Sequence, residues 1–177
     1  DDARSPLSEA YRSLCTSLQF STARGMPKSL LITSADPAEG KSITSLAIAQ
    51  HFSRLGLKVL LVDADMRSPS LHKALRADSS IGLSSCLAGV CQPPDAIQTT
   101  DIENLAFLPS GPLPPNAADL LSSPHLMSLL SLSLQAFDLV VIDGPPVLGI
   151  ADAPLLSNAA EATVFVIGAG VARTGSV

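Results

Sequence analysis

The segment from Ser29 to Ser42, SLLITSADPAEGKS, constrains the fold more than any other part of the chain. It opens with a short apolar run that is typical of a buried strand and closes on Gly40 and Lys41 before the serine. A glycine, four residues and then Gly-Lys-Ser form a loop that binds phosphate between a strand and a helix. Ala35 stands where the first glycine is expected. The segment predicts a phosphate-binding loop, with a chance Gly-Lys-Ser at a helix start as the alternative.

Apolar runs and helical segments alternate around this loop. Residues 42–56 have helical periodicity and end at Gly56, which favours a helix C-terminus. Four more buried strands are predicted at residues 58–65, 105–111, 137–146 and 161–170. Continuous apolar strands that alternate with helices indicate a parallel sheet covered on both faces. We therefore expect one α/β domain over residues 1–177, with a mostly parallel sheet and the P-loop nucleoside triphosphatase fold.

The remaining segments are expected to be shorter elements. Residues 8–20 predict an amphipathic helix with Ser8 as its N-cap and Leu14, Leu18 and Phe20 roughly on one side. Short helices are expected in PSLHKAL and LSSCLAG, a loop in CQPPD, and a helix from about Ala117 onward.

Three acidic residues follow buried strands. Asp63 and Asp65 end one predicted strand, and Asp143 ends another. Ligands of open parallel sheets bind outside the carboxyl ends of the strands, so these acids are expected to converge with Lys41 and Ser42. Lys41 would reach the β- and γ-phosphates, and the Ser42 hydroxyl would bind Mg²⁺. Three adjacent carboxylates repel one another unless a cation such as Mg²⁺ lies between them. The alternative is that the acids only cap loops.

Composition narrows the class of protein. The chain of 177 residues is 46% hydrophobic and carries a net charge of −5 without a basic run, which argues against nucleic acid as a partner. No apolar run reaches the length of a membrane span. The three scattered cysteines predict reduced thiols in a cytoplasmic protein. Because the chain begins Asp-Asp without a methionine, it is interpreted as a possible piece of a longer protein, and a membrane anchor elsewhere is left open.

Several blocks together resemble the cytoplasmic catalytic domain of bacterial tyrosine kinases that serve capsule and exopolysaccharide export. These P-loop proteins are related to the septum-positioning and chromosome-partitioning ATPases. The blocks that carry the resemblance are EAYRSLCTSLQF, TSADPAEGKS, VLLVDADMRSPSLH, GLSSCLAG, LPSGPLPPNAADLLSS and FDLVVIDGPPVLGIADA. The partitioning ATPases carry a second lysine near position 36, where this chain has Asp36 and Pro37, so the kinase branch is favoured.

The resemblance implies ATP-dependent tyrosine autophosphorylation that regulates polysaccharide chain length or export, with ATP or ADP and Mg²⁺ as cofactors. Asp63 would be the base that accepts the proton of a tyrosine hydroxyl, with Lys41 and Asp65 as the other catalytic residues. The implied ligands of the metal are Ser42, Asp65 and Asp143. The implied nucleotide-binding residues are Ala38, Glu39, Gly40, Lys41, Ser42 and Ile43.

The resemblance also implies partners. A membrane-embedded activator, either a separate protein or a missing part of this chain, would hold the domain at the inner face of the bacterial plasma membrane. Glu9 and Arg12 fit the subunit-contact pattern of a ring-shaped homo-oligomer, but Cys15 replaces its second arginine, which weakens the expectation of a ring. The alternative is an ordinary intrahelical pair of Glu9 with Arg12. The single tyrosine, Tyr11, is interpreted as structural, and the family's tyrosine-rich tail is not found.

Three positions depart from the residues that are usual in the family, and two further residues have open roles. Ile43 replaces a threonine, Ala38 a glycine and Ala47 an asparagine, and each change would weaken nucleotide binding. Arg67 would steady phosphate charge or a neighbouring subunit, or form a surface ion pair, and Asp152 would cap a helix or take part in catalysis.

The histidines show no metal-ligand spacing and are interpreted as surface or packing residues. Two rival functions stay open. One is a degenerate scaffold that binds nucleotide without transferring phosphate, and the other is an ATPase switch of the partitioning type.

Overall fold

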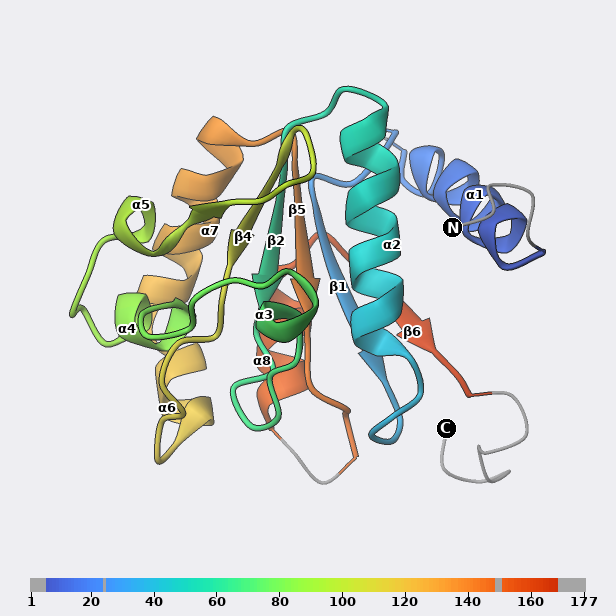
Figure 1. Cartoon of the computed structure of the whole chain (residues 1–177). Coiled ribbons are helices and arrows are strands. Elements are labelled where there is room, and N and C mark those ends of the chain that lie inside the picture. Colours follow the sequence, from blue (N-terminus) through green and yellow to red (C-terminus); the bar gives the residue numbers. More distant parts are fainter. Residues whose placement is uncertain (1–5, 24, 149–150, 169–177) are drawn as a thin grey trace.

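Six strands form one sheet in the computed structural model, which describes residues 6–23, 25–148 and 151–168. The strand order is β3-β4-β2-β5-β1-β6, and every neighbouring pair is parallel except β3 with β4. The strands are β1 (Ser29–Ser34), β2 (Val59–Asp63), β3 (Gln98–Thr99), β4 (Leu105–Leu108), β5 (Leu139–Asp143) and β6 (Ala162–Val166). The predicted α/β class is confirmed, and the carboxyl ends of β1, β2 and β5 meet at one edge of the sheet (Figure 1).

Helices cover both faces of this sheet. On one face α2 packs against β1, β2 and β5, with α1 outside it, and on the other α7 and α8 contact β5 and β1 (Figure 1). The helices are α1 (Pro6–Gln19), α2 (Lys41–Arg54), α3 (Leu71–Ala74), α4 (Leu83–Leu87), α5 (Pro93–Ala96), α6 (Ala117–Leu121), α7 (Pro124–Ala136) and α8 (Asp152–Ala159). None of the helices in the described part of the chain is long and apolar enough to cross a membrane.

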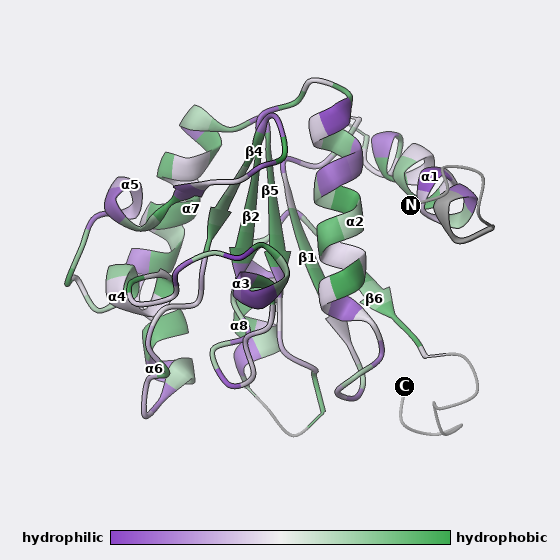
Figure 2. Cartoon of the chain, in the orientation of Figure 1, coloured by the Kyte–Doolittle hydropathy of each residue, from purple (hydrophilic) through white to green (hydrophobic). Residues whose placement is uncertain are grey.

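The sheet separates two apolar layers, because successive side chains of a strand point to opposite faces. Leu30 and Ile32 of β1 pack with Ile48 and Phe52 of α2, and all four are fully buried. Leu31, between them, belongs to the layer that α4, α6, α7 and α8 cover. The apolar strands at the centre of Figure 2 are therefore buried on both sides, as their continuous Val, Ile and Leu sequences predict.

Some expectations for the helices were wrong. Residues 91–95 were expected to be a loop, but Pro93–Ala96 forms a helix, because proline suits the first helical turn and the Asp95 carboxylate accepts the Gln92 N–H at 3.0 Å. The helix expected from Ala117 is divided in two. Pro124 has no N–H and starts a new helix after Leu121.

The first helix also differs from its prediction. It begins at Pro6, so Ser8 lies inside the helix and is not its N-cap. Leu18 is buried as expected, but Phe20 is 79% exposed because the helix ends at Gln19 and the chain turns there. Among residues 9–19 of this helix, Cys15 is the fully buried one, and it packs in the apolar layer around α2.

The strand predictions are confirmed, and the four strands after the phosphate loop have shorter bounds than expected. The strands end at Asp63 and Asp143, so Asp65 lies two residues beyond its strand, and of the expected last strand residues 169–170 lie outside the described residues. The two-residue strand β3 was not predicted, since it is too short to show a period in the sequence.

Candidate functional site: a phosphate loop above buried acids

The predicted phosphate loop lies between β1 and α2 at the carboxyl edge of the sheet. Gly40 precedes the helix with φ 93°, and Ala38 has φ 65°. Both values belong to the left-handed region, which glycine adopts freely and alanine adopts at a cost. Alanine in place of glycine at position 38 is therefore strained, because the backbone there takes the conformation that a glycine would favour.

A cavity of about 480 Å³ opens above this loop. Its walls come from the loop, from the first turn of α2 and from the segment after β2. The lining residues are Pro37, Ala38, Gly40, Lys41, Ser42, Ile43, Asp65, Arg67, Ser68, Ser70 and Pro146. Five of the six predicted nucleotide-binding residues line this cavity, and the sixth, Glu39, does not.

Two of the three predicted acids lie below the cavity and do not line it. Asp63 and Asp143 are register partners at the ends of β2 and β5, and they are 0% and 1% exposed. Asp63 Oδ2 accepts the Leu71 N–H at 3.2 Å, and Asp143 Oδ1 accepts the Ser45 hydroxyl at 2.9 Å. Asp63 Oδ1 and Asp143 Oδ2 are buried without a hydrogen-bond partner. Unpaired buried carboxylate oxygens are costly, so this pair would gain from a ligand that approaches it.

The surroundings favour the protonated forms of these acids. Burial raises the pKa of Asp63 to about 7, and the nearby Asp143 charge adds to the rise. Burial also raises the pKa of Asp143 to about 6, although the Ser42 and Ser45 hydroxyls and the Lys41 charge oppose the shift. A cation beside these acids would restore their ionised forms.

Asp65 is the acid that reaches the cavity. It is 8% exposed, and its Oδ1 accepts the backbone N–H groups of Arg67 at 3.2 Å and Ser68 at 3.0 Å. These bonds hold residues 65–68 in a tight turn beside the phosphate loop, so the side chain has a fixed orientation.

Arg67 joins this turn to α8. Its Nε donates to Asp152 Oδ2 at 2.8 Å and its Nη2 donates to Asp152 Oδ1 at 3.2 Å. The Asp152 side chain is 2% exposed and that of Arg67 is 50% exposed, so one charge is buried and the other lies at the cavity wall. The Asp152 contact raises the pKa of Arg67. The expected ion pair of Arg67 is present, but only the Arg67 side of it lies at the surface, because its partner Asp152 is buried.

Glu39 has a different position from the one its motif predicts. Its Oε2 accepts the Asp36 N–H at 2.9 Å, and its Oε1 accepts the Gly168 N–H at 3.0 Å. These hydrogen bonds lower the pKa of Glu39. The carboxylate ties the phosphate loop to the residues after β6 instead of facing the cavity.

Sequence reasoning missed Ser45 and Thr44. Ser45 Oγ lies 2.9 Å from both the Lys41 carbonyl oxygen and Asp143 Oδ1, so its one proton is shared between these acceptors, and the contact with Asp143 links α2 to β5. The Tyr11 hydroxyl lies 3.3 Å from Thr44 Oγ1, so the structural interpretation of Tyr11 agrees with its contact between α1 and α2. The only sequence signal for Ser45 was its place one helical turn after Lys41.

The donors fit a magnesium ion better than a softer metal. Within the described residues no three His, Cys, Asp or Glu side chains lie close enough to hold a metal by themselves. Magnesium usually takes one or two carboxylates together with substrate phosphates and water, all as oxygen ligands. Asp65 at the wall, the Ser42 hydroxyl and the unpaired oxygen of Asp143 supply that kind of donor.

The predicted subunit-contact residues lie on the outer face of α1. Arg12 and Glu9 form an intrahelical pair at 3.3 Å, with 57% and 69% of their side-chain surfaces exposed. Cys15 lies elsewhere, fully buried in the core, and burial raises the pKa of its thiol to about 11. The replaced arginine position therefore does not share the exposed face.

Residues 37–175 match the sequence profile described as an AAA domain. Tyrosine-protein kinase YwqD of Bacillus subtilis is 42% identical over 163 residues, which cover 92% of this chain and 69% of the relative. The chain belongs to the bacterial tyrosine kinase family. The kinase domain of Escherichia coli ETK superposes with a TM-score of 0.93 at 31% identity, covering 98% of this chain and 68% of that one.

Two further solved structures are similar to this chain. The chimerical protein CapA2B2 has a TM-score of 0.88 at 35% identity, covering 93% of this chain and 73% of that one. The septum-site protein MinD of Pyrococcus horikoshii, complexed with Mg-ADP, has a TM-score of 0.69 at 27% identity, covering 80% and 58%. The P-loop fold and its relation to the MinD-type ATPases are both confirmed.

Proposed function

We propose that this kinase-family domain transfers the γ-phosphoryl group of ATP to tyrosine in a magnesium-dependent autokinase reaction that serves capsule or exopolysaccharide production. The observation that carries the proposal is the convergence of Lys41, Ser42 and Asp65 on one cavity above two buried, incompletely paired acids. Phosphoryl transfer depends mainly on positioning and charge stabilisation, which such a loop provides.

The residues of the cavity take distinct roles in this proposal. The backbone of the phosphate loop and the Lys41 ammonium bind the phosphates. Ser42, Asp65 and Asp143 would hold Mg²⁺, which neutralises charge on the phosphates when it is bound. Glu39 keeps the loop in place through its bonds to Asp36 and Gly168.

Asp63 is the proposed base for the tyrosine hydroxyl. A general base works best when its pKa is near the working pH, and burial raises the pKa of Asp63 to about 7. Its Oδ1 has no partner and is free to accept a proton. Because Asp63 is 0% exposed, the proposal requires the segments that cover Asp63 to move aside when a tyrosine approaches.

The partners follow from the family. We infer a membrane-embedded activator and a position at the inner face of the plasma membrane, supported by the likeness to the chimerical protein CapA2B2. We also infer that residues 1–177 form a single domain and that the outer face of α1, with Glu9 and Arg12, contacts a neighbouring subunit.

Two variants test the function. Lys41→Met should lose nucleotide binding in calorimetry with Mg-ATP, whereas Asp63→Asn should bind nucleotide and lose at least about 100-fold in phosphate transfer to a tyrosine-containing peptide. Asp101→Asn, a change of the same kind at an exposed position, serves as the control. Wild-type transfer by Asp63→Asn would refute the base role, and nucleotide binding by Lys41→Met would refute the loop assignment.

A degenerate scaffold is the second candidate function. Ala38 adopts a left-handed conformation, and Ile43 exposes 66% of its surface at the cavity wall where a hydroxyl is expected. Folded wild-type protein that binds no Mg-ATP would favour this candidate. Nucleotide-driven dimers without phosphotyrosine would favour the partitioning-type switch instead.

A further inference from the structure

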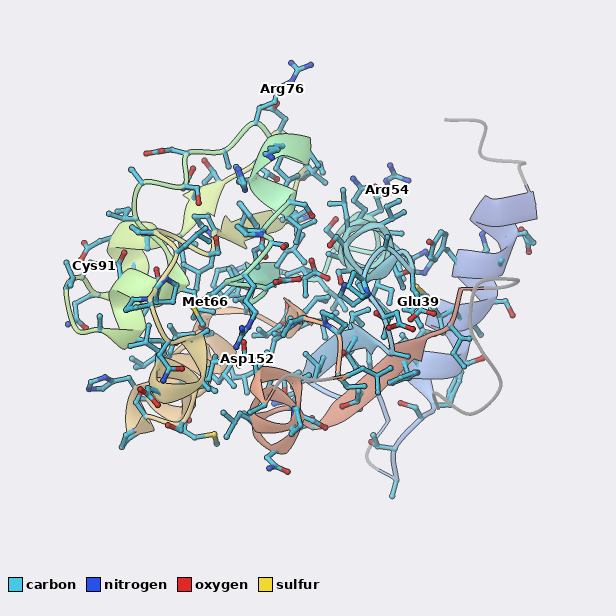
Figure 3. All side chains as sticks on the ribbon, turned by 90° about the horizontal axis from the view of Figure 1, so that it is seen from below. Glu39, Arg54, Met66, Arg76, Cys91 and Asp152 are labelled. Atoms are coloured by element: carbon cyan, nitrogen blue, oxygen red, sulfur yellow. The ribbon has the colours of Figure 1, made fainter. Side chains whose placement is uncertain are left out.

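Two of the three cysteines lie in contact on a flank of the molecule distant from the phosphate loop. The Sγ atoms of Cys86 and Cys91 are 3.5 Å apart, and both thiols are free. Figure 3 places Cys91 at the outer side of the molecule, across the view from Glu39 of the phosphate loop. The proposed kinase function uses neither thiol.

The end of α4 brings the two cysteines together. Gly89 follows the helix with φ 74°, and its N–H donates to the Cys86 carbonyl at 3.0 Å. The Val90 N–H donates to the Ser85 carbonyl at 2.9 Å. This pair of bonds is a Schellman motif, which reverses the chain after a helix. Cys91 is the next residue, so the reversal turns it back toward Cys86.

The two thiols differ in their access to solvent. Cys86, on α4, is 7% exposed and packs in the apolar layer that this helix covers, whereas Cys91 is half-buried. Both line a cavity of about 130 Å³ that also involves His125 and Gln92. Burial, with the hydrogen bond to Cys91 as a second cause, raises the pKa of the Cys86 thiol to about 12. An oxidant in solvent therefore meets Cys91 first.

We propose that Cys86 and Cys91 are a reversible modification site, at which a peroxide converts the two thiols into an intramolecular disulfide. The sulfur atoms need to approach by roughly 1.5 Å to reach the bond length of about 2.0 Å. Side-chain rotation within the small cavity allows this approach, and the Schellman turn keeps the two residues together in both states.

The chemistry balances with hydrogen peroxide as the oxidant. The Cys91 thiolate attacks one peroxide oxygen, the O–O bond breaks, hydroxide leaves, and Cys91 becomes a sulfenic acid. The Cys86 sulfur then attacks the Cys91 sulfur, the S–O bond breaks, and water leaves with the proton of Cys86. Two thiols lose two electrons, and one peroxide is reduced to two waters. A dithiol reductant restores both thiols.

Thiol counting on the full chain tests this site. The reduced protein has three thiols, and brief exposure to hydrogen peroxide followed by denaturation should leave one, that of Cys15. The intact mass should fall by two hydrogen atoms, and dithiothreitol should restore all three thiols. Cys15→Ala should go from two thiols to none, because its oxidisable pair is intact.

Cys91→Ser is the matched control, because it removes one sulfur at a half-buried position and leaves Cys86 and Cys15 in place. It should keep both of its remaining thiols under the same exposure, because Cys86 and Cys15 are buried. Three thiols remaining in the wild-type chain would overturn the proposal. So would a gain of oxygen mass with two thiols left, which means that Cys91 is oxidised alone, or a covalent dimer on a non-reducing gel.

Discussion

The carboxyl edge of the sheet and the outer face of α1 both carry charged side chains, but in opposite environments. Asp63 and Asp143 are at most 1% exposed and each has an oxygen without a partner, whereas Glu9 and Arg12 pair with each other in solvent. Burying an unpaired carboxylate costs free energy, and an exposed pair costs almost nothing. The buried acids at the carboxyl ends of the strands therefore destabilise the fold when no ligand neutralises them. The exposed pair on α1 carries no such cost and is compatible with an isolated domain.

The largest expected effect on stability concerns the two buried acids. Asp63 has an ordinary pKa of 3.8 when the chain is unfolded and a pKa of about 7 when it is folded. Between these values the folded chain holds a proton that the unfolded chain releases, so the free energy of unfolding falls as pH rises. Asp143, with a pKa of about 6 in the fold, contributes in the same direction.

Nucleotide-free protein in a chelating buffer should therefore lose stability from about pH 4 to about pH 7. Asp63→Asn should remove part of this slope and raise the free energy of unfolding at pH 8 by on the order of 2–4 kcal/mol. Urea unfolding at a series of pH values measures both quantities. Parallel pH profiles for variant and wild type would contradict the raised pKa of Asp63.

The ion pair of Arg67 with Asp152 mixes the two environments, since only one partner is buried. Arg67→Ala leaves a buried carboxylate without its partner and should cost about 1–3 kcal/mol of stability. Asp152→Asn leaves a half-exposed guanidinium that water can solvate, so its cost should be smaller. Chemical denaturation of both variants and of the double variant gives the order. A greater loss for Asp152→Asn would contradict this account.

The phosphate loop offers a smaller test, of backbone strain. Ala38→Gly relieves a residue held at φ 65° and should raise the free energy of unfolding of the nucleotide-free chain by up to about 1 kcal/mol. The free energy of Mg-ATP binding should stay the same if the loop keeps its conformation, because strain present with and without nucleotide cancels. Urea unfolding and calorimetry on this variant and on Ala47→Gly, a control in the following helix, measure the two quantities. A change in Mg-ATP binding by Ala38→Gly alone would mean that the loop changes conformation when it takes phosphate.

The contrast also explains what the sequence could predict. Asp63 and Asp143 end buried strands, and Lys41 begins the helix that follows another. Because parallel topology brings the carboxyl ends of such strands together, their location at the same end of the sheet was predictable. The depth of Asp63 below the cavity, and the turn of Glu39 toward Gly168, depend on side-chain packing that no spacing records. Phe20 was misplaced because one turn at a helix end abolishes the helical period.

The smallest expected effect on stability concerns the exposed pair on α1. Glu9→Gln removes one charge of a solvated i,i+3 pair and should change the free energy of unfolding of the monomer by less than about 0.5 kcal/mol. Arg12→Gln should behave alike, and the double variant should show almost no coupling.

Sedimentation is the more sensitive measurement, because exposed charges contribute more to the free energy when a partner excludes water. If α1 contacts a neighbouring subunit, either variant should weaken assembly while urea unfolding of the monomer stays unchanged. A stability loss above 1 kcal/mol in the monomer would mean that the pair supports the fold itself, and the difference between the two regions would disappear.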